Sequence, residues 1–188
     1  LSSSEAEEIG KLVSRVLFST TDSTEFEVCL KIQYKLMRLQ KLNCTIIQPV
    51  IESILEGQLP VFFGIPVYLY NGDSSTGSSA KRLSKYLSIY IKTAFQQNST
   101  ESITPIVDKL LEWLPLSIDF TYITILRPLA ECIKLKCITD ETDIETIIGL
   151  VLELPKTVLA KDFPDAISSA SEIISLLLES HPNLLQVS

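Results

Sequence analysis

The sequence has little of what many functional classes require. Glycine is scarce, with 6 residues among 188, and there is one histidine, one tryptophan and one methionine. Scarce glycine disfavours turn-rich β architectures and the glycine-rich loops that hold phosphates. The single histidine, His181, lies next to Pro182, and no pattern around any cysteine pairs a nucleophile with it as a base. We therefore expect neither an enzyme nor a bound cofactor.

Basic residues are in the minority. Lys and Arg number 16 against 23 Asp and Glu, which gives a formal net charge of −7 at pH 7. Nucleic acids and anionic membranes bind through dense Lys and Arg, so this balance argues against direct contact with either. The longest apolar run, residues 59–70, contains two prolines and a glycine and is shorter than the ~20 residues that a membrane span needs. No membrane segment is expected.

Close groups of metal ligands are missing as well. Four cysteines lie within or beside apolar segments: Cys29, Cys44, Cys132 and Cys137. They form no Cys-x-x-Cys pair, so no zinc site is expected. The acidic clusters at residues 5–8 and 140–145 lie in predicted first turns of helices, where the helix dipole accounts for them. Buried, reduced cysteines are typical of intracellular proteins, which indicates the nucleus or the cytoplasm.

Apolar residues at helical spacing are abundant. The clearest stripe runs over residues 103–114, with Leu110 and Leu111 in its middle and Lys109 on the opposite face. The expected N-caps of the helices include Asp22, Thr45, Thr104 and Asp140. Two further leucines, Leu12 and Leu152, fall on the stripes of their own segments and are expected to face the core.

Similar segments recur over most of the chain and predict an all-α fold of about nine or ten helices without a convincing strand. A short helix is expected within residues 59–70, with a strand as the alternative, and another helical turn over 156–161. Residues 71–79 are rich in Gly and Ser and predict a flexible loop inside a single domain of residues 1–188. Because the chain starts at Leu1 and Met37 is its only methionine, we expect a fragment of a larger protein.

Three helices share a pattern of proline, two apolar residues, an acidic residue, a variable residue and an apolar residue. The proline and the acid are Pro49 with Glu52, Pro105 with Asp108, and Pro128 with Glu131. Pro128 is expected to break or kink its helix. The pattern resembles one helix type of armadillo and HEAT repeats. The resemblance implies an irregular armadillo/HEAT-like stack of helices.

Stacked helices expose long surfaces on which a segment of another protein can lie. By analogy, we expect a non-catalytic protein–protein interaction scaffold within a larger intracellular protein. The alternative is a helical module associated with nucleic acid in a chromatin, DNA-repair or RNA-processing complex. A basic stripe along one face of the fold would favour that alternative.

The candidate partner-binding residues lie on both sides of residues 71–79. They are Phe62, Phe63, Tyr68 and Tyr70 before that stretch, and Lys81, Arg82 and Lys85 after it. Exposed aromatic rings with a basic rim suit a partner segment that combines apolar and acidic residues. The structural alternatives are burial of the aromatic residues in the core and a merely solvated helix face for the three cations.

Overall fold

The computed structural model describes residues 1–56, 74–116, 121–154 and 164–182. These ranges contain eight α-helices, two short 3₁₀ helices and no strand. The α-helices are α1 (Ser3–Ser19), α2 (Ser23–Arg38), α3 (Cys44–Leu55), α4 (Ser74–Gln96), α5 (Thr104–Trp113), α6 (Thr121–Lys134), α7 (Glu141–Glu153) and α8 (Pro164–Ser180); the 3₁₀ helices are η2 (Thr100–Ser102) and η3 (Leu114–Leu116). The all-α class is thus confirmed, with eight helices rather than nine or ten. The helical segments expected within 59–70 and over 156–161 lie outside the described residues.

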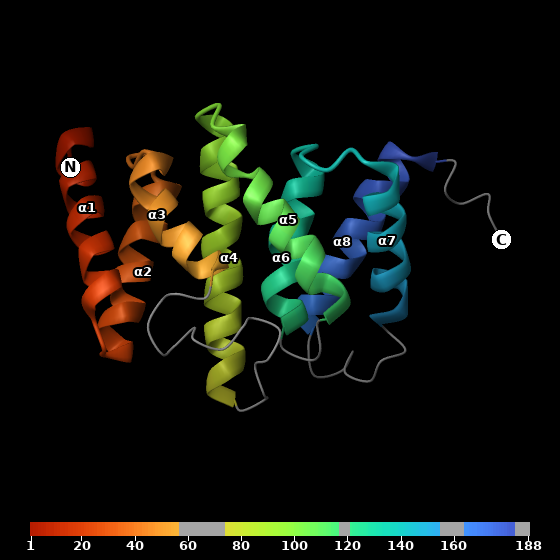
Figure 1. Ribbon diagram of the computed structural model, residues 1–188, viewed down its shortest axis with the longest axis horizontal. Coiled ribbons are helices and arrows are strands. Elements are labelled where there is room, and N and C mark those ends of the chain that lie inside the picture. Colours follow the sequence, from red (N-terminus) through yellow and green to blue (C-terminus); the bar gives the residue numbers. More distant parts are fainter. Residues whose placement is uncertain (57–73, 117–120, 155–163, 183–188) are drawn as a thin grey trace.

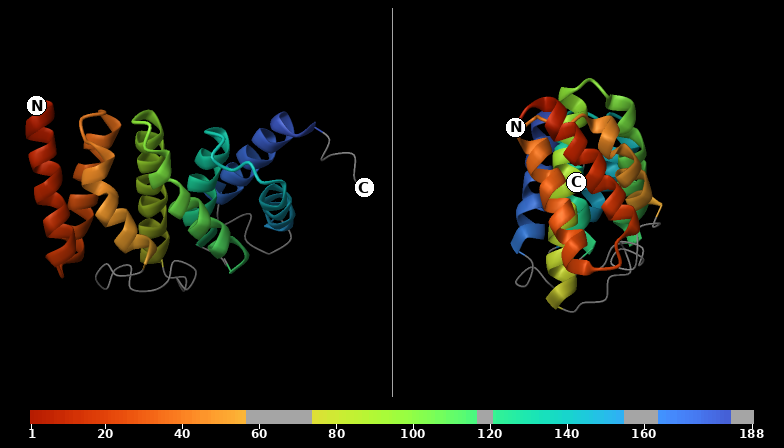
Figure 2. Two further views of the ribbon diagram at one scale, coloured as in Figure 1. Left: turned by 45° about the horizontal axis from the view of Figure 1, so that its top comes forward. Right: turned by 90° about the vertical axis from the view of Figure 1, so that its left-hand side faces the viewer.

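The helices form a row that runs from α1 at one end to α7 and α8 at the other (Figure 1). α2 packs against α4, α4 against α6, and α6 against α8, so the even-numbered helices form a continuous layer. Each of them also contacts the odd-numbered helix that precedes it. In the view along the row, α2 and α8 lie on one side and α3 on the other (Figure 2). This bundle of four helix pairs is compatible with a helical repeat fold.

The three turns that join one pair to the next have the same backbone geometry. After α2, α4 and α6 the chain contains a residue with positive φ: Gln40 (55°), Asn98 (56°) and Lys136 (57°). The residue that follows each of them donates a backbone hydrogen bond to the carbonyl five residues earlier, at 3.1, 2.8 and 2.9 Å. This is the Schellman motif, which ends a helix by a left-handed residue. The chain therefore leaves the even-numbered layer in the same way at each junction.

The three helices that contain the proline pattern do not occupy equivalent positions. Pro49 lies inside α3 and Pro105 at the start of α5, both odd-numbered, whereas Pro128 lies inside α6 in the other layer. α6 also continues through Pro128 as one helix, so of the two predicted effects, a break or a kink, the break does not occur. Pro128 is buried, and α6 is covered by α4 and α8. We attribute the continuity of α6 to this packing, which offsets the ~3 kcal/mol that an interior proline costs.

Several helix starts differ from the predicted ones. Asp22 and Asp140 cap α2 and α7 as predicted. α3 is capped instead by Asn43, whose side chain accepts a hydrogen bond from the backbone N–H of Thr45 at 3.0 Å. α5 begins at Thr104 and has no side-chain cap, because the backbone of η2 runs directly into it. A residue already inside a helical turn cannot serve as the N-cap.

α4 begins at Ser74, within the stretch that the composition predicted as a loop. Residues 74–79 therefore have helical backbone, and residues 71–73 lie outside the described ranges. Serine costs only a few tenths of a kcal/mol relative to good helix formers. Each residue added to an existing helix gains a backbone hydrogen bond without a new nucleation step. A helix anchored by buried residues from Leu83 onward can thus extend backward into Ser-rich sequence, and the predicted loop boundary is wrong.

One continuous cluster of buried apolar side chains extends from α1 to α8. Leu110 of α5 is fully buried, as predicted, and Leu111 packs against the cluster while partly exposed. Leu12 and Leu152 were expected to face the core but are 60% and 52% exposed. Among the described helices α1 is the first of the row and has neighbours on one side only (Figure 1), so these helices leave part of its apolar stripe uncovered.

A buried hydrogen-bond network joins three helices. Gln33 of α2 is 0% exposed; its Nε2 donates to Ser14 Oγ of α1 at 2.8 Å, and its Oε1 accepts from the Tyr86 hydroxyl of α4 at 2.5 Å. Burial raises the pKa of Tyr86 well above its ordinary value, so the hydroxyl keeps its proton and remains a donor. Because buried polar groups are costly unless paired, this network favours one alignment of α1, α2 and α4.

The network predicts non-additive effects on stability. Tyr86→Phe leaves the Oε1 of Gln33 buried without a donor, so we expect it to lower the free energy of unfolding by about 1–3 kcal/mol. Adding Gln33→Leu removes the unpaired group, so the double variant should lose less than the sum of the single losses. Urea unfolding measures each loss. Tyr34→Phe, at a partly exposed position of α2, is the control and should change stability by less than about 0.5 kcal/mol. Strictly additive losses would show that Tyr86 and Gln33 are not coupled.

The orientation of α5 is tested by two neighbouring positions. Leu110→Ala removes a fully buried side chain and should lower the free energy of unfolding by ~2–5 kcal/mol. Lys109 forms an ion pair with Glu112, with Nζ and Oε2 2.7 Å apart and side chains 36% and 54% exposed. Exposed pairs of this kind contribute less than about 1 kcal/mol, which bounds the loss expected for Lys109→Ala. Equal shifts of the urea midpoint would mean that the buried face is assigned wrongly.

Candidate functional site

The structure separates the three predicted cations. Lys81 and Lys85 of α4 are exposed and lie four residues apart, on the same side of the helix. Arg82 points toward α2 and forms an ion pair with Glu27, with both side chains 37% exposed. The predicted aromatic residues Phe62, Phe63, Tyr68 and Tyr70 lie outside the described residues.

Lys81 and Lys85 belong to a larger set of exposed cations on α2, α4 and α6. On each helix they follow one another at three, four, seven or eleven residues, which places them on one side of that helix. The three helices pack side by side, and each also contacts the odd-numbered helix that precedes it, so we infer that their exposed sides lie together on the opposite side of the row. We call the following eight residues the basic face: Lys31, Lys35 and Arg38 of α2, Lys81, Lys85 and Lys92 of α4, and Arg127 and Lys134 of α6.

The two layers differ in charge. α2, α4 and α6 together contain nine Lys or Arg residues and three Glu, a net charge of +6. The odd-numbered helices contain three Lys or Arg residues and ten Asp or Glu, a net charge of −7. α8, the last helix of the even-numbered layer, adds three acidic residues and no basic ones. The net charge of the whole chain is therefore negative even though α2, α4 and α6 together are positively charged.

Apolar side chains accompany the cations on α2. Val28 is 47% exposed and lies one helical turn before Lys31, and Leu39 is 64% exposed and follows Arg38 directly. Exposed apolar groups next to cations are typical of surfaces that bind other proteins, where burial of the apolar part adds to the electrostatic attraction. The basic face is thus chemically mixed at the α2 end.

Two of the eight residues of the basic face, Lys81 and Lys85, were predicted from the sequence, and the other six were missed. Lys31 and Arg127 are far apart in the sequence and come onto one surface only because α2, α4 and α6 stack. One local signal was present: the stretch that forms α4 contains four Lys or Arg residues and no acidic residue. That signal indicates a basic helix but does not identify its basic neighbours.

Catalytic and metal-binding chemistry finds little support in the described ranges. Burial raises the pKa of the Cys29 and Cys137 thiols, and that of Cys132 most strongly, which keeps them protonated and weakly nucleophilic. Within residues 1–56, 74–116, 121–154 and 164–182, no three His, Cys, Asp or Glu side chains are grouped so that they could hold a metal ion. No described helix combines the length and the apolar character needed to cross a membrane.

No protein-family model, curated protein or solved structure matches this chain. The function is therefore inferred from the charge and shape of its surfaces.

Proposed function

We propose that the chain is a non-catalytic scaffold of the armadillo/HEAT kind, and that its basic face binds an acidic segment of a partner protein. The observation that carries the proposal is the grouping of eight exposed cations on one layer of a chain whose net charge is −7. A row of stacked helix pairs supports it, because such rows provide extended surfaces for a partner's segment. Opposite charges on the two partners speed their encounter and select the binding surface.

The size of the basic face suits a short protein segment. Neighbouring packed helices lie ~8–10 Å apart, so the distance from α2 across α4 to α6 is roughly 20 Å. An extended chain advances ~3.3 Å per residue, so about six residues cross the face. A segment of this length can carry several carboxylates and still place apolar side chains against Val28 and Leu39.

A nucleic-acid partner is the second candidate, because a basic stripe along one face is also its signature. Two observations favour the protein segment. The exposed Val28 and Leu39 have no counterpart in a phosphate backbone, which is recognised mainly through cations. A strand that followed the row beyond α6 would next meet α8, where Glu172 and Glu179 are exposed and repel phosphates.

Charge reversal on the basic face tests the proposal. The probe is a fluorescein-labelled peptide that repeats Glu-Leu-Asp, followed by fluorescence anisotropy. The wild-type chain should bind it, and binding should weaken as salt screens the charges. Lys35→Glu with Lys85→Glu should weaken binding by roughly tenfold or more, since each change replaces an attraction with a repulsion. Both side chains are exposed, so the thermal midpoint should change little.

The matched control reverses two cations elsewhere. Lys11→Glu with Arg15→Glu changes the net charge by the same amount on α1, where both side chains are exposed outside the basic face. This variant should bind the peptide nearly as well as the wild type. Equal losses in the two double variants would contradict a specific basic face. A labelled DNA or RNA duplex that binds tightly where the acidic peptide does not would favour the nucleic-acid candidate.

A further inference from the structure

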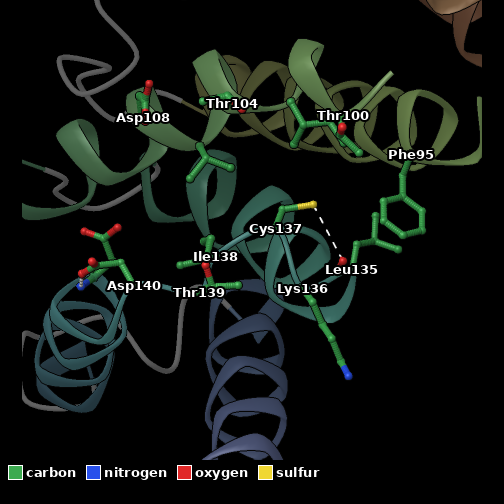
Figure 3. A pocket seen from close by; sticks show the side chains of 13 residues that line it. Phe95, Thr100, Thr104, Asp108, Leu135, Lys136, Cys137, Ile138, Thr139 and Asp140 are labelled. Atoms are coloured by element: carbon green, nitrogen blue, oxygen red, sulfur yellow. Dashed lines mark hydrogen bonds between the residues drawn. The ribbon is translucent and has the colours of Figure 1, made fainter. Parts of the chain in front are cut away.

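A second surface lies at the edge of the row where α4 turns into η2 and α5 and where α6 turns into α7 (Figure 3). It is a groove of about 360 Å³. Its floor is apolar: Ile103, Val107 and Ile138 line it and are at most 8% exposed. Phe95 also lines it and is 39% exposed. An occupant of this groove therefore needs an apolar group.

The two ends of the groove differ in chemistry. Asp108 of α5 and Asp140 of the α6–α7 turn lie toward one end in Figure 3, and Phe95 and Leu135 lie toward the other. Asp143 lines the groove as well, and Lys136 is the single basic residue among the described residues that line it. The Lys136 side chain extends away from the acidic end in the same view. The groove is thus apolar at one end and negatively charged at the other.

The carboxylates are not equally available to a ligand. Asp140 caps α7, and its Oδ1 accepts hydrogen bonds from the backbone N–H groups of Thr142 and Asp143 at 2.9 and 3.3 Å. The side chains of Asp108 and Asp143 have no hydrogen bond or ion pair with any residue in the ranges that the structure describes. A cation that enters the acidic end can therefore pair with either carboxylate without breaking an existing interaction.

We infer that the groove binds a basic segment of a second protein, with an apolar side chain near Phe95 and a Lys or Arg side chain near Asp108 and Asp143. The volume is at the small end of ligand sites, and the groove is open, which suits a short stretch of chain that crosses the edge. A metal ion fits less well, because these carboxylates are not grouped as metal ligands. This site is separate from the basic face, so the inference does not rest on the proposed function.

Amide NMR with two matched peptides tests this inference. The probes are Gly-Leu-Lys-Leu-Arg-Gly and the same peptide with Glu in place of Lys and Arg, each added to the ¹⁵N-labelled chain. The basic peptide should shift amide signals around Thr104, Asp108 and Ile138, and leave those of the basic face unchanged. The acidic peptide should not shift the groove signals, because like charges repel.

Two substitutions at the acidic end measure the role of charge. Asp108→Asn with Asp143→Asn keeps the shape of both side chains and should weaken binding of the basic peptide by roughly fivefold or more. The control is Glu8→Gln with Glu145→Gln, which removes the same charge at exposed positions outside the groove and should bind like the wild type. Thr104→Lys, which adds a cation at an exposed lining position, should weaken binding independently of the Asn variant.

Three results would overturn the inference: shifts that map outside the groove, an acidic peptide that perturbs the same amides, or full affinity in the Asn or Thr104→Lys variant. Loss of amide dispersion would reveal an unfolded variant, and the remaining variant then decides. Because the basic face is unchanged in all these proteins, failure of this test leaves the proposed function unaffected.

Discussion

The packing of α4 between α2 and α6 determines how the other helices are arranged. Leu83, Tyr86 and Leu87 of α4 are at most 2% exposed, which is the burial of a central core helix rather than of a surface helix. Hydrogen bonds fix its position along the axis. The Tyr86 hydroxyl donates a hydrogen bond to Gln33 of α2. The side-chain amide of Gln97, just after α4, makes two more: its Nε2 donates to the Leu42 carbonyl at 3.0 Å, and its Oε1 accepts from the Cys44 backbone N–H at 2.8 Å. The register of the first two pairs is therefore specified by polar groups as well as by apolar burial.

This packing also creates the two candidate surfaces. Because neighbours cover the other sides of α4, its exposed cations must share the remaining side, and the same constraint acts on α2 and α6. A chain of negative net charge can thus present a basic face although only the stretch that forms α4 is locally basic in its sequence. The groove has a related origin. The left-handed turns at Asn98 and Lys136 repeat one geometry in successive pairs, and the segments that follow them enclose the groove between α5 and the start of α7.

The sequence predicted what depends on neighbours three or four residues away. It identified the all-α class, the buried Leu110 and the caps Asp22 and Asp140, because a stripe or a cap is a local pattern. It could not predict what depends on a helix's place in the row. Leu12 lies on a regular stripe but belongs to the first helix, and Pro128 repeats a pattern of odd-numbered helices in the even-numbered layer. The groove and the six basic-face residues other than Lys81 and Lys85 were missed for the same reason, since stacking alone brings these residues together.

Native-state hydrogen exchange tests most directly whether α4 is the central helix of the fold. The amides of the buried part of α4, residues 83–94, should exchange only through global unfolding, with the highest protection in the chain. Those of α1, which has neighbours on one side, should exchange through local opening at a free energy lower by several kcal/mol. The gap should narrow when Tyr86→Phe weakens the link between α4 and α2. Protection of α1 equal to or above that of α4 would contradict this account of the fold.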